Sequence, residues 1–456
     1  MKKLLCLVTL MACSDPSEQQ PVDAPSGDDS QIVTDGPTDR PVTVTVMDEG
    51  VGVAGVSVYF QQPDHTVFTK VVTNASGVAA TVVAGGGAVT VVDPFANNTL
   101  AGAPSHSLRT YLGVQPGDEL LVVGDDDGEN ATVTVTIPAI KDFAFANLES
   151  SCGGTTLEAL TGTQVELYGC DGMADLVVVA YDELSNPLGY LYKANVAITD
   201  QGTVNLGSET YTAVPNASFS YASIPAAFGN VFGTNTLVSP RGTIFATTSG
   251  SSLTAGAASV TKRRPLVTST TSVQQLGFDS ASPTMSAHTV FHWQPAAAAH
   301  AFDGTGKFLP DFTAAPSYTA ATRQVSWTSS GGVPPDLTFV SIDAVRNSAE
   351  TMFWQWKLIA PYTATTLTLP ALPTEIAQYV PLATDSVELV ELGAAKLPGG
   401  YAAARPLYFA NLDGPPITGT SGTISLVSYS EPNTVRTTGP TKVKAAIKAK
   451  APRARR

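Results

Sequence analysis

The sequence predicts an all-β protein built of tandem antiparallel β-sandwiches, and three observations lead to this fold class. Apolar and polar residues alternate strictly from Val42 to Val46 and again from Val133 to Ile137, which is the pattern of half-buried strands. Gly, Pro, Asn and Ser, the residues typical of turns, separate the apolar runs. The runs are short and rich in β-branched residues, and no long amphipathic helix is evident between them.

Length and charge set the next limits. The chain has 456 residues, which predicts two to four domains with sizeable cores. It carries 25 basic and 39 acidic residues, for a formal net charge of −14. An acidic body repels polyanions, so we expect no nucleic-acid partner.

The first twelve residues have the layout of a secretory signal peptide, with two lysines, an apolar run too short to span a bilayer, and a small residue at the end. Leu10 to Cys13 resembles the lipobox of bacterial lipoproteins. That resemblance implies cleavage before Cys13, lipidation of Cys13, and, from Ser14, the outer membrane of a Gram-negative bacterium. The alternative is a plain cleaved signal with an incidental cysteine. Residues 13–40 are polar, acidic and Pro-rich, which predicts a flexible stalk.

Three folded segments are predicted after the stalk, at 41–138, 139–264 and 265–436. Their borders are placed near Ile137 to Lys141 and near Lys262 to Pro265, where charge and proline interrupt the apolar pattern. The last segment, 437–456, is basic and lacks an apolar face. It is interpreted as a disordered end, with two alternatives: an electrostatic tether to anionic lipid headgroups, lipopolysaccharide or extracellular polyanions, or an arm that folds back on the acidic body.

Individual strands follow from the same alternation. The strand at Val133 to Ile137 is expected to pair as a hairpin with the strand before it, across a turn at Gly124 to Asn130. Val56, Val58 and Phe60 are expected to face away from Ser57 and Tyr59 in another half-buried strand. Further strands are predicted at 165–168, 176–181, 324–328, 337–345, 353–359, 387–392 and 424–429.

Two regions resemble known domain families. Val46 to Val58, followed by the turn Thr73 to Gly77, is similar to carboxypeptidase regulatory-like and bacterial Ig-like domains, although Gly52 stands where a proline is usual. This resemblance covers residues 41–138 and implies a stalk, adhesion or accessory module without catalytic residues. Gln324 to Trp327 and Phe353 to Pro361 are similar to fibronectin type III-like repeats, in which a strand tryptophan anchors the core.

Four cysteines are present, and two lie in the N-terminal signal region. Cys152 and Cys170 remain as an even pair in a chain predicted to be exported, so we expect a disulfide. A metal site is disfavoured because two cysteines without a CxxC spacing or a nearby histidine supply too few ligands.

Two further groups of residues each allow a functional interpretation and a purely structural one. Asp125, Asp127 and Glu129 concentrate carboxylates in one turn, which is either a Ca²⁺ loop or a solvated turn. Trp354 and Trp356 point to one face of a strand, as core packing or as a platform that stacks on sugar rings.

The predicted segment 265–436 also holds three of the five histidines, His288, His292 and His300. The first two lie four residues apart in a predicted strand, about 13 Å, so they are not expected to share a metal. They are interpreted as surface or packed residues.

Motifs of common enzymes are lacking: the sequence has no GxSxG, no HExxH and no complete phosphate loop. The sequence therefore predicts a lipid-anchored protein of the outer membrane or cell surface, without enzymatic activity or cofactor, with a structural, adhesive or ligand-binding role. Its expected partners are the membrane and a glycan or protein. One alternative is a carbohydrate-binding accessory protein that uses Trp354 and Trp356. Another is a hydrolase with scattered catalytic residues.

Overall fold

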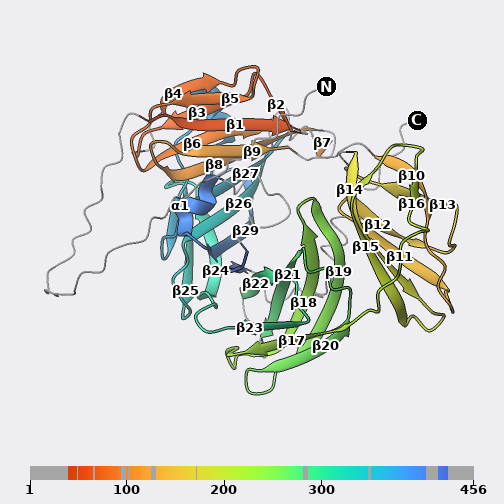
Figure 1. The fold of residues 1–456 in the computed structure, drawn as a ribbon. Coiled ribbons are helices and arrows are strands. Elements are labelled where there is room, and N and C mark those ends of the chain that lie inside the picture. The colour runs from red at the N-terminus through yellow and green to blue at the C-terminus, as the bar shows by residue number, and fades with distance from the viewer. Residues whose placement is uncertain are drawn as a thin grey trace, which may run out of the picture. The chain divides into compact units, whose positions relative to one another are not determined.

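The structure is a computed structural model in which most of the chain after the predicted stalk is described. The described residues are 40–48, 50–64, 67–93, 99–100, 103–124, 130–170, 172–280, 286–347, 351–406 and 420–429. Their regular secondary structure consists almost entirely of strands, which confirms the predicted all-β class (Figure 1).

One large sheet of 13 strands collects segments from residue 57 to residue 429. At its middle, β27 and β8 pair in parallel, from Phe353 opposite Ser105 to Ile359 opposite Tyr111. In order across the sheet the strands are β19 (Gly242–Ser252), β18 (Phe228–Ser239), β21 (Thr271–Ser280), β22 (Ser286–Pro295), β30 (Gly422–Tyr429), β29 (Ser386–Lys396), β26 (Leu337–Arg346), β27 (Met352–Pro361), β8 (Ala103–Val114), β6 (Gly87–Asp93), β3 (Ser57–Gln61) and β4 (Val67–Val72), with β7 (Thr99–Leu100) paired to β8.

Five smaller sheets accompany the large one in the described part of the chain. Two of them form the disulfide-containing sandwich: β13 (Thr163–Leu167), β10 (Ala131–Thr136) and β16 (Thr203–Asn205) in one, and β12 (Gly153–Leu157), β11 (Phe145–Ser150), β14 (Met173–Tyr181) and β15 (Pro187–Ala197) in the other. The remaining three are β2 (Val51–Gly52), β1 (Val42–Asp48) and β5 (Val78–Thr81) with β9 (Glu119–Val123); β20 (Ala258–Arg263), β17 (Asn216–Ala222) and β23 (Ala299–Asp303); and β24 (Asp311–Thr319), β25 (Gln324–Ser330) and β28 (Thr366–Thr368).

The large sheet has an apolar core on each face. On one face, Val58 and Ile359 share a buried cluster with Val44 of β1. On the other face, Tyr59 and Trp356 share a cluster with Trp327 of β25. Burial on both faces corrects the half-buried pattern predicted for the strand at Val56 to Phe60, because Tyr59 is as buried as its neighbours.

Gly52 stands where a proline was expected, and there is a steric reason for a glycine at this position. A Cβ atom on Gly52 would collide with the backbone of Ser76, in the later turn that the sequence analysis matched. In that turn Gly77 has a left-handed φ of 74° and Asn74 Oδ1 accepts backbone hydrogen bonds from Ser76 and Val78. The two turns therefore approach each other too closely for a side chain at position 52.

The predicted hairpin between the strand before Gly124 and the strand at Val133 is wrong. β9 pairs in parallel with β1, whereas β10 pairs with β13 and β16 in a different sheet. Alternation indicates which side chains of a strand share a face, but it carries no information about the partner strand. The other predicted strands are all present, within a few residues of their expected ends.

Strand pairing runs across both predicted borders. β10 lies before residue 138 and pairs with strands after it, and β17 pairs with β23, on the far side of residue 264. At the second border, Lys262 and Arg263 are exposed but Arg264 is buried. The three predicted segments thus share sheets, and their borders remain a sequence prediction.

The helical elements of the described residues are short: the 3-10 helix η1 (Thr374–Tyr379), and α1 (Gly400–Ala404), which continues into 3-10 conformation at residues 405 and 406. The described residues include no helix with the length and apolar character needed to cross a membrane.

Candidate functional site at a disulfide-anchored junction

The predicted disulfide is confirmed. Cys152 and Cys170 are bonded, with their Cα atoms 5.2 Å apart and a sequence separation of 18. Cys152 follows β11 and Cys170 follows β13, so the bond joins the two sheets of one sandwich. Both cysteines are buried and belong to the apolar core of that sandwich.

A buried carboxylate lies next to this disulfide. Asp175 is in β14, a strand that is otherwise almost wholly apolar, and its side chain is 4% exposed. The pairing of β14 with β15 shifts register between Ala174 and Leu176, which is where Asp175 lies. Its backbone N–H donates to Ser151 Oγ at 3.2 Å, and the Ser151 N–H donates to the Asp175 carbonyl at 3.1 Å.

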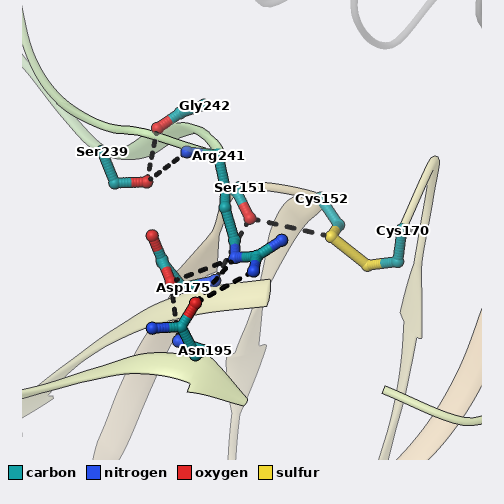
Figure 2. Close-up of polar contacts among 8 residues, drawn as sticks. All are labelled: Ser151, Cys152, Cys170, Asp175, Asn195, Ser239, Arg241 and Gly242. Carbon is teal, nitrogen blue, oxygen red and sulfur yellow. Dashed lines mark hydrogen bonds and ion pairs between the residues drawn. A yellow bond between two sulfur atoms is a disulfide. The ribbon is translucent and has the colours of Figure 1, made fainter. Parts of the chain in front are cut away.

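Asp175 receives donors from two other elements (Figure 2). The Asn195 backbone N–H donates to Asp175 Oδ1 at 2.7 Å, and Arg241 Nε lies 3.7 Å from the same oxygen. Asn195 has a left-handed φ of 55°, a conformation that asparagine tolerates well. A buried carboxylate is stable only with such partners, and here the partners come from β15 and from the turn between β18 and β19.

Arg241 links the large sheet to the sheet formed by β12, β11, β14 and β15. It occupies the turn between β18 and β19, and its Nε and Nη2 donate to Asn195 Oδ1 at 3.1 and 2.9 Å. Ser239 holds the turn by accepting from the Arg241 N–H and donating to the Gly242 carbonyl, both at 3.2 Å. The turn is therefore fixed at the strand end by side-chain hydrogen bonds, and its arginine reaches across to the disulfide-containing sandwich.

Apolar contacts continue the junction beneath these polar groups. Val177 and Val179 on β14 share a buried cluster with Leu237, Ile244 and Phe245 of β18 and β19. The Tyr190 hydroxyl donates to the Leu266 carbonyl at 2.7 Å. Burial, followed by the nearby Asp175 charge, raises the pKa of Tyr192. We call this assembly of disulfide, Asp175, Asn195, Arg241 and apolar cluster the junction.

The junction positions elements and holds no exposed reactive group. Its carboxylate has its donors, its arginine is paired, and its cysteines are oxidised. Within the described residues, no group of three or more His, Cys, Asp or Glu side chains could hold a metal ion. The arrangement is suited to mechanical fixation of two sheets.

Sequence reasoning found the disulfide but missed Asp175 and Arg241. A signal for Asp175 was present, because a carboxylate inside the apolar run Met173 to Tyr181 requires a buried partner. No comparable signal identifies Arg241, which is 66 residues away and lies in an ordinary turn.

Trp354 and Trp356 face the same side of β27, as predicted, but that side is the core. Trp354 is 2% exposed and Trp356 is fully buried, with its Nε1 donating to Thr110 Oγ1 at 2.8 Å. Tyr379 packs beside Trp354 at 6.4 Å between ring centroids. The proposed sugar platform is therefore wrong, because β25 and η1 cover this face of the sheet.

The three clustered histidines are packed residues. His288 is buried and its Nε2 lies 2.8 Å from Asp311 Oδ1, and His292 Nδ1 lies 3.1 Å from Thr423 Oγ1. His288 and His292 both lie in β22, as the strand prediction required. His300 is buried beside Arg264.

The remaining predicted site residues lie outside the described part of the chain. These are the lipidation residue Cys13 and the calcium candidates Asp125, Asp127 and Glu129, together with the basic segment 437–456.

Comparison with known proteins adds little. No family model matches the chain, and no curated protein matches it. Among solved structures, the Bacillus anthracis TIE protein is similar at 10% identity and a TM-score of 0.14, over 58% of this chain and 50% of that one. E. coli alpha-2-macroglobulin has the same identity and TM-score over 86% of this chain and 27% of that one. This chain therefore spans about half the length of the first neighbour and about a quarter of the second.

Proposed function

We propose that the protein is a lipid-anchored, non-catalytic component of the cell envelope, whose folded part serves a structural or adhesive role. The observation that carries this proposal is the junction. There a buried disulfide, a buried carboxylate with its donors and an apolar cluster together fix the disulfide-containing sandwich to the large sheet. A part that transmits force or holds a spacing needs such fixed joints between its sheets.

Export is supported by the disulfide itself. Structural disulfides form and persist in oxidising compartments, such as the periplasm and the cell surface. Two buried cysteines that bond across a core fit that environment, and they agree with the signal-like residues 1–12. The lipobox-like residues Leu10 to Cys13 then supply the anchor, and residues 14–40 supply a spacer between membrane and fold. We place the protein at the outer membrane or cell surface on this basis.

A glycan or protein is the proposed partner beyond the membrane. The resemblance of residues 41–138 to carboxypeptidase regulatory-like domains favours an accessory or adhesive module. The carbohydrate-binding alternative rested on Trp354 and Trp356, and both rings are buried. A glycan site, if the protein has one, must use other residues.

The anchor is tested by comparing wild type, Cys13→Ala and the matched control Cys6→Ala, in which the substituted cysteine lies inside the predicted signal. Cells are fed an alkyne-labelled fatty acid, fractionated, and treated with a membrane-impermeant amine reagent that reacts with exposed lysines such as Lys141 and Lys262. We expect acyl label and outer-membrane recovery for wild type and Cys6→Ala, and loss of both for Cys13→Ala.

Two results would count against the proposal. Acyl label that persists in Cys13→Ala would show that this residue is not the anchor. An unlabelled wild type recovered from the medium would instead support the plain cleaved signal. Reaction of the surface reagent with intact cells distinguishes the outward-facing protein from one that faces the periplasm.

A further inference from the structure

A polar cluster is buried between the sheet of β17, β20 and β23 and the part of the large sheet formed by β18, β21 and β22. Its surroundings are apolar and rich in phenylalanine, including Phe219, Phe278 and Phe302. We call it the Arg264 cluster, and its members are Asn235, Arg264, Ser272, Gln274, His292, Gln294 and His300.

Arg264 is the centre of the cluster and is only 1% exposed. Its Nη2 donates to Ser272 Oγ at 3.2 Å and lies 2.5 Å from His300 Nε2. The guanidinium carbon is 5.0 Å from the centroid of the Phe219 ring. The same His300 nitrogen, Nε2, lies 2.7 Å from the Ala297 carbonyl, and Gln294 Nε2 lies 2.6 Å from His300 Nδ1. Burial and the Arg264 charge lower the pKa of His300 to about 4.

The other members follow from strand register. Asn235 of β18 lies opposite Gln274 of β21, and Gln274 lies opposite His292 of β22. Ser272, the partner of Arg264, is two residues before Gln274 and lies on the same face of β21, about 7 Å along the strand. The polar side chains therefore form one continuous strip across three strands.

Several polar atoms in this strip are buried without a hydrogen-bond partner among the described residues. They are Arg264 Nε and Nη1, both amide atoms of Gln274, Asn235 Oδ1 and His292 Nε2. His292 Nδ1 lies 3.1 Å from Thr423 Oγ1, and the ring also has backbone hydrogen bonds with Gly422 and Ala301. Arg264 and Gln274 alone supply three unpartnered donors, against two acceptors from Gln274 and Asn235. Donors thus outnumber acceptors among the unpartnered atoms. Buried polar groups are rarely left unpaired, and each such group calls for an explanation.

The cluster also has an uncompensated positive charge. Burial lowers the pKa of Arg264 to about 10, which leaves the guanidinium charged at neutral pH. No ion pair of the described residues includes Arg264, and the cluster itself contains no carboxylate. Lys307 adds a second positive charge that acts on His292. The acidic neighbour of Lys307 is Asp303, an exposed residue with its own bonds to Thr305.

We propose that the Arg264 cluster binds one small monovalent anion of the halide class, chloride in the cell envelope, using donors from Arg264, Gln274 and His292. Gln274 and His292 lie directly opposite each other on neighbouring strands, and Ser272, which holds the Arg264 guanidinium, lies on the same face of β21, so the unpartnered donors belong to one strip. One permanent charge in a closely packed interior matches a monovalent ion better than phosphate or sulfate, which carry more charge and more acceptor atoms.

The test is the stability of the whole purified chain in sodium chloride, sodium bromide and sodium gluconate at equal ionic strength, since gluconate is too large for a buried site. Chloride and bromide should divide the unfolding equilibrium constant by one plus the ratio of halide concentration to dissociation constant, which is about tenfold when the halide is at ten times its dissociation constant. Arg264→Met should lose this halide dependence, while the matched control Arg263→Met, at an exposed neighbouring position, should retain it.

A second measurement does not depend on a folded variant. Crystals of wild type grown in bromide should give an anomalous peak within hydrogen-bond distance of Arg264. The proposal is overturned if no peak occurs there, or if peaks occur only on the surface. It is also overturned if wild type shows no halide dependence, or if the dependence persists in Arg264→Met, because the halide then does not act through this guanidinium.

Discussion

At the scale of single residues, the two buried charges described above differ in how they are compensated. Asp175 accepts from a backbone N–H and lies near a guanidinium, all from elements that pack together at the junction. Arg264 has a hydroxyl and an imidazole as neighbours, and two of its nitrogens have no protein partner in the described chain. Asp175 thus finds its hydrogen-bond and charge partners within the fold, whereas the unpartnered nitrogens of Arg264 require a further acceptor.

Asp175→Ala should lower the free energy of unfolding by about 2 to 4 kcal/mol, because it leaves the buried Asn195 N–H without its acceptor and removes the carboxylate that pairs with the Arg241 guanidinium. Urea denaturation measures this loss. Glu183→Ala, at an exposed position outside the junction, is the control and should change stability by less than about 0.5 kcal/mol. Equal stability of Asp175→Ala and wild type would mean that Asp175 does not hold the junction.

Trp354→Ala should destabilise the protein by about 3 to 5 kcal/mol, because it removes a large side chain from the core between β27 and η1. Trp354→Phe keeps most of the packing and removes a buried Nε1 that has no partner in the described residues, so its effect should be smaller. Retention on polysaccharide columns should be the same for Trp354→Phe and wild type. A selective loss of retention would reopen the sugar platform.

Stability should fall in acid because of His300. Its pKa is lowered from 6.5 to about 4, mainly by burial and then by the Arg264 charge. His292 and Gln294 also face the ring. Above pH 6.5 the His300 ring is neutral in both the native and the unfolded state. Below pH 6.5 the ring is protonated in the unfolded chain but stays neutral in the native state. The free energy of unfolding should therefore fall by about 3 kcal/mol between pH 6.5 and 4.

The control for this pH effect is His300→Gln, measured by denaturation at the same pH values. The variant lacks the titrating ring, so its loss of stability between pH 6.5 and 4 should be smaller than that of wild type. Identical pH profiles for the two proteins would assign the acid sensitivity to other groups.

At the scale of elements, alternation predicted strands well and their partners poorly. Val133, Val135 and Ile137 are buried as their spacing required. Their strand nevertheless pairs with β13 and β16, because register and partner depend on long-range packing that a period of two does not encode. The same limit applies to the junction: the cysteine count predicted its disulfide, but the bond from Arg241 to Asn195 joins a turn to a strand, and neither carries a sequence motif.

The disulfide should contribute about 3 kcal/mol, because it closes a loop of 18 residues in the unfolded chain. Replacing both cysteines by alanine avoids an unpaired thiol. Urea denaturation of this double variant should show the loss with or without reductant, whereas reductant should destabilise only the wild type. A double variant as stable as oxidised wild type would show that the bond is dispensable for the sandwich.

At the scale of the whole molecule, sheets and sequence segments do not coincide. The large sheet draws strands from all three predicted segments, so none of those segments contains a complete set of strand partners. The disulfide-containing sandwich is different. Its apolar core is formed entirely by residues between Ala131 and Tyr211, and both of its sheets lie in the same range. It is therefore the part of the chain best suited to fold alone.

A fragment of residues 130–213 should consequently fold, while a fragment of 139–213, cut at the predicted border, should not. The shorter one lacks β10, the central strand of its sheet, and with it the buried Val133, Val135 and Ile137. Each of these side chains contributes about 1.5 to 3 kcal/mol. Dispersed amide signals in NMR and a cooperative urea transition report folding. Because Val177 and Val179 lose the cover of β18 and β19, both fragments are measured at low micromolar concentration. If the shorter fragment folds equally well, the border at residue 138 is the correct one, and β10 is an accessory to the sandwich.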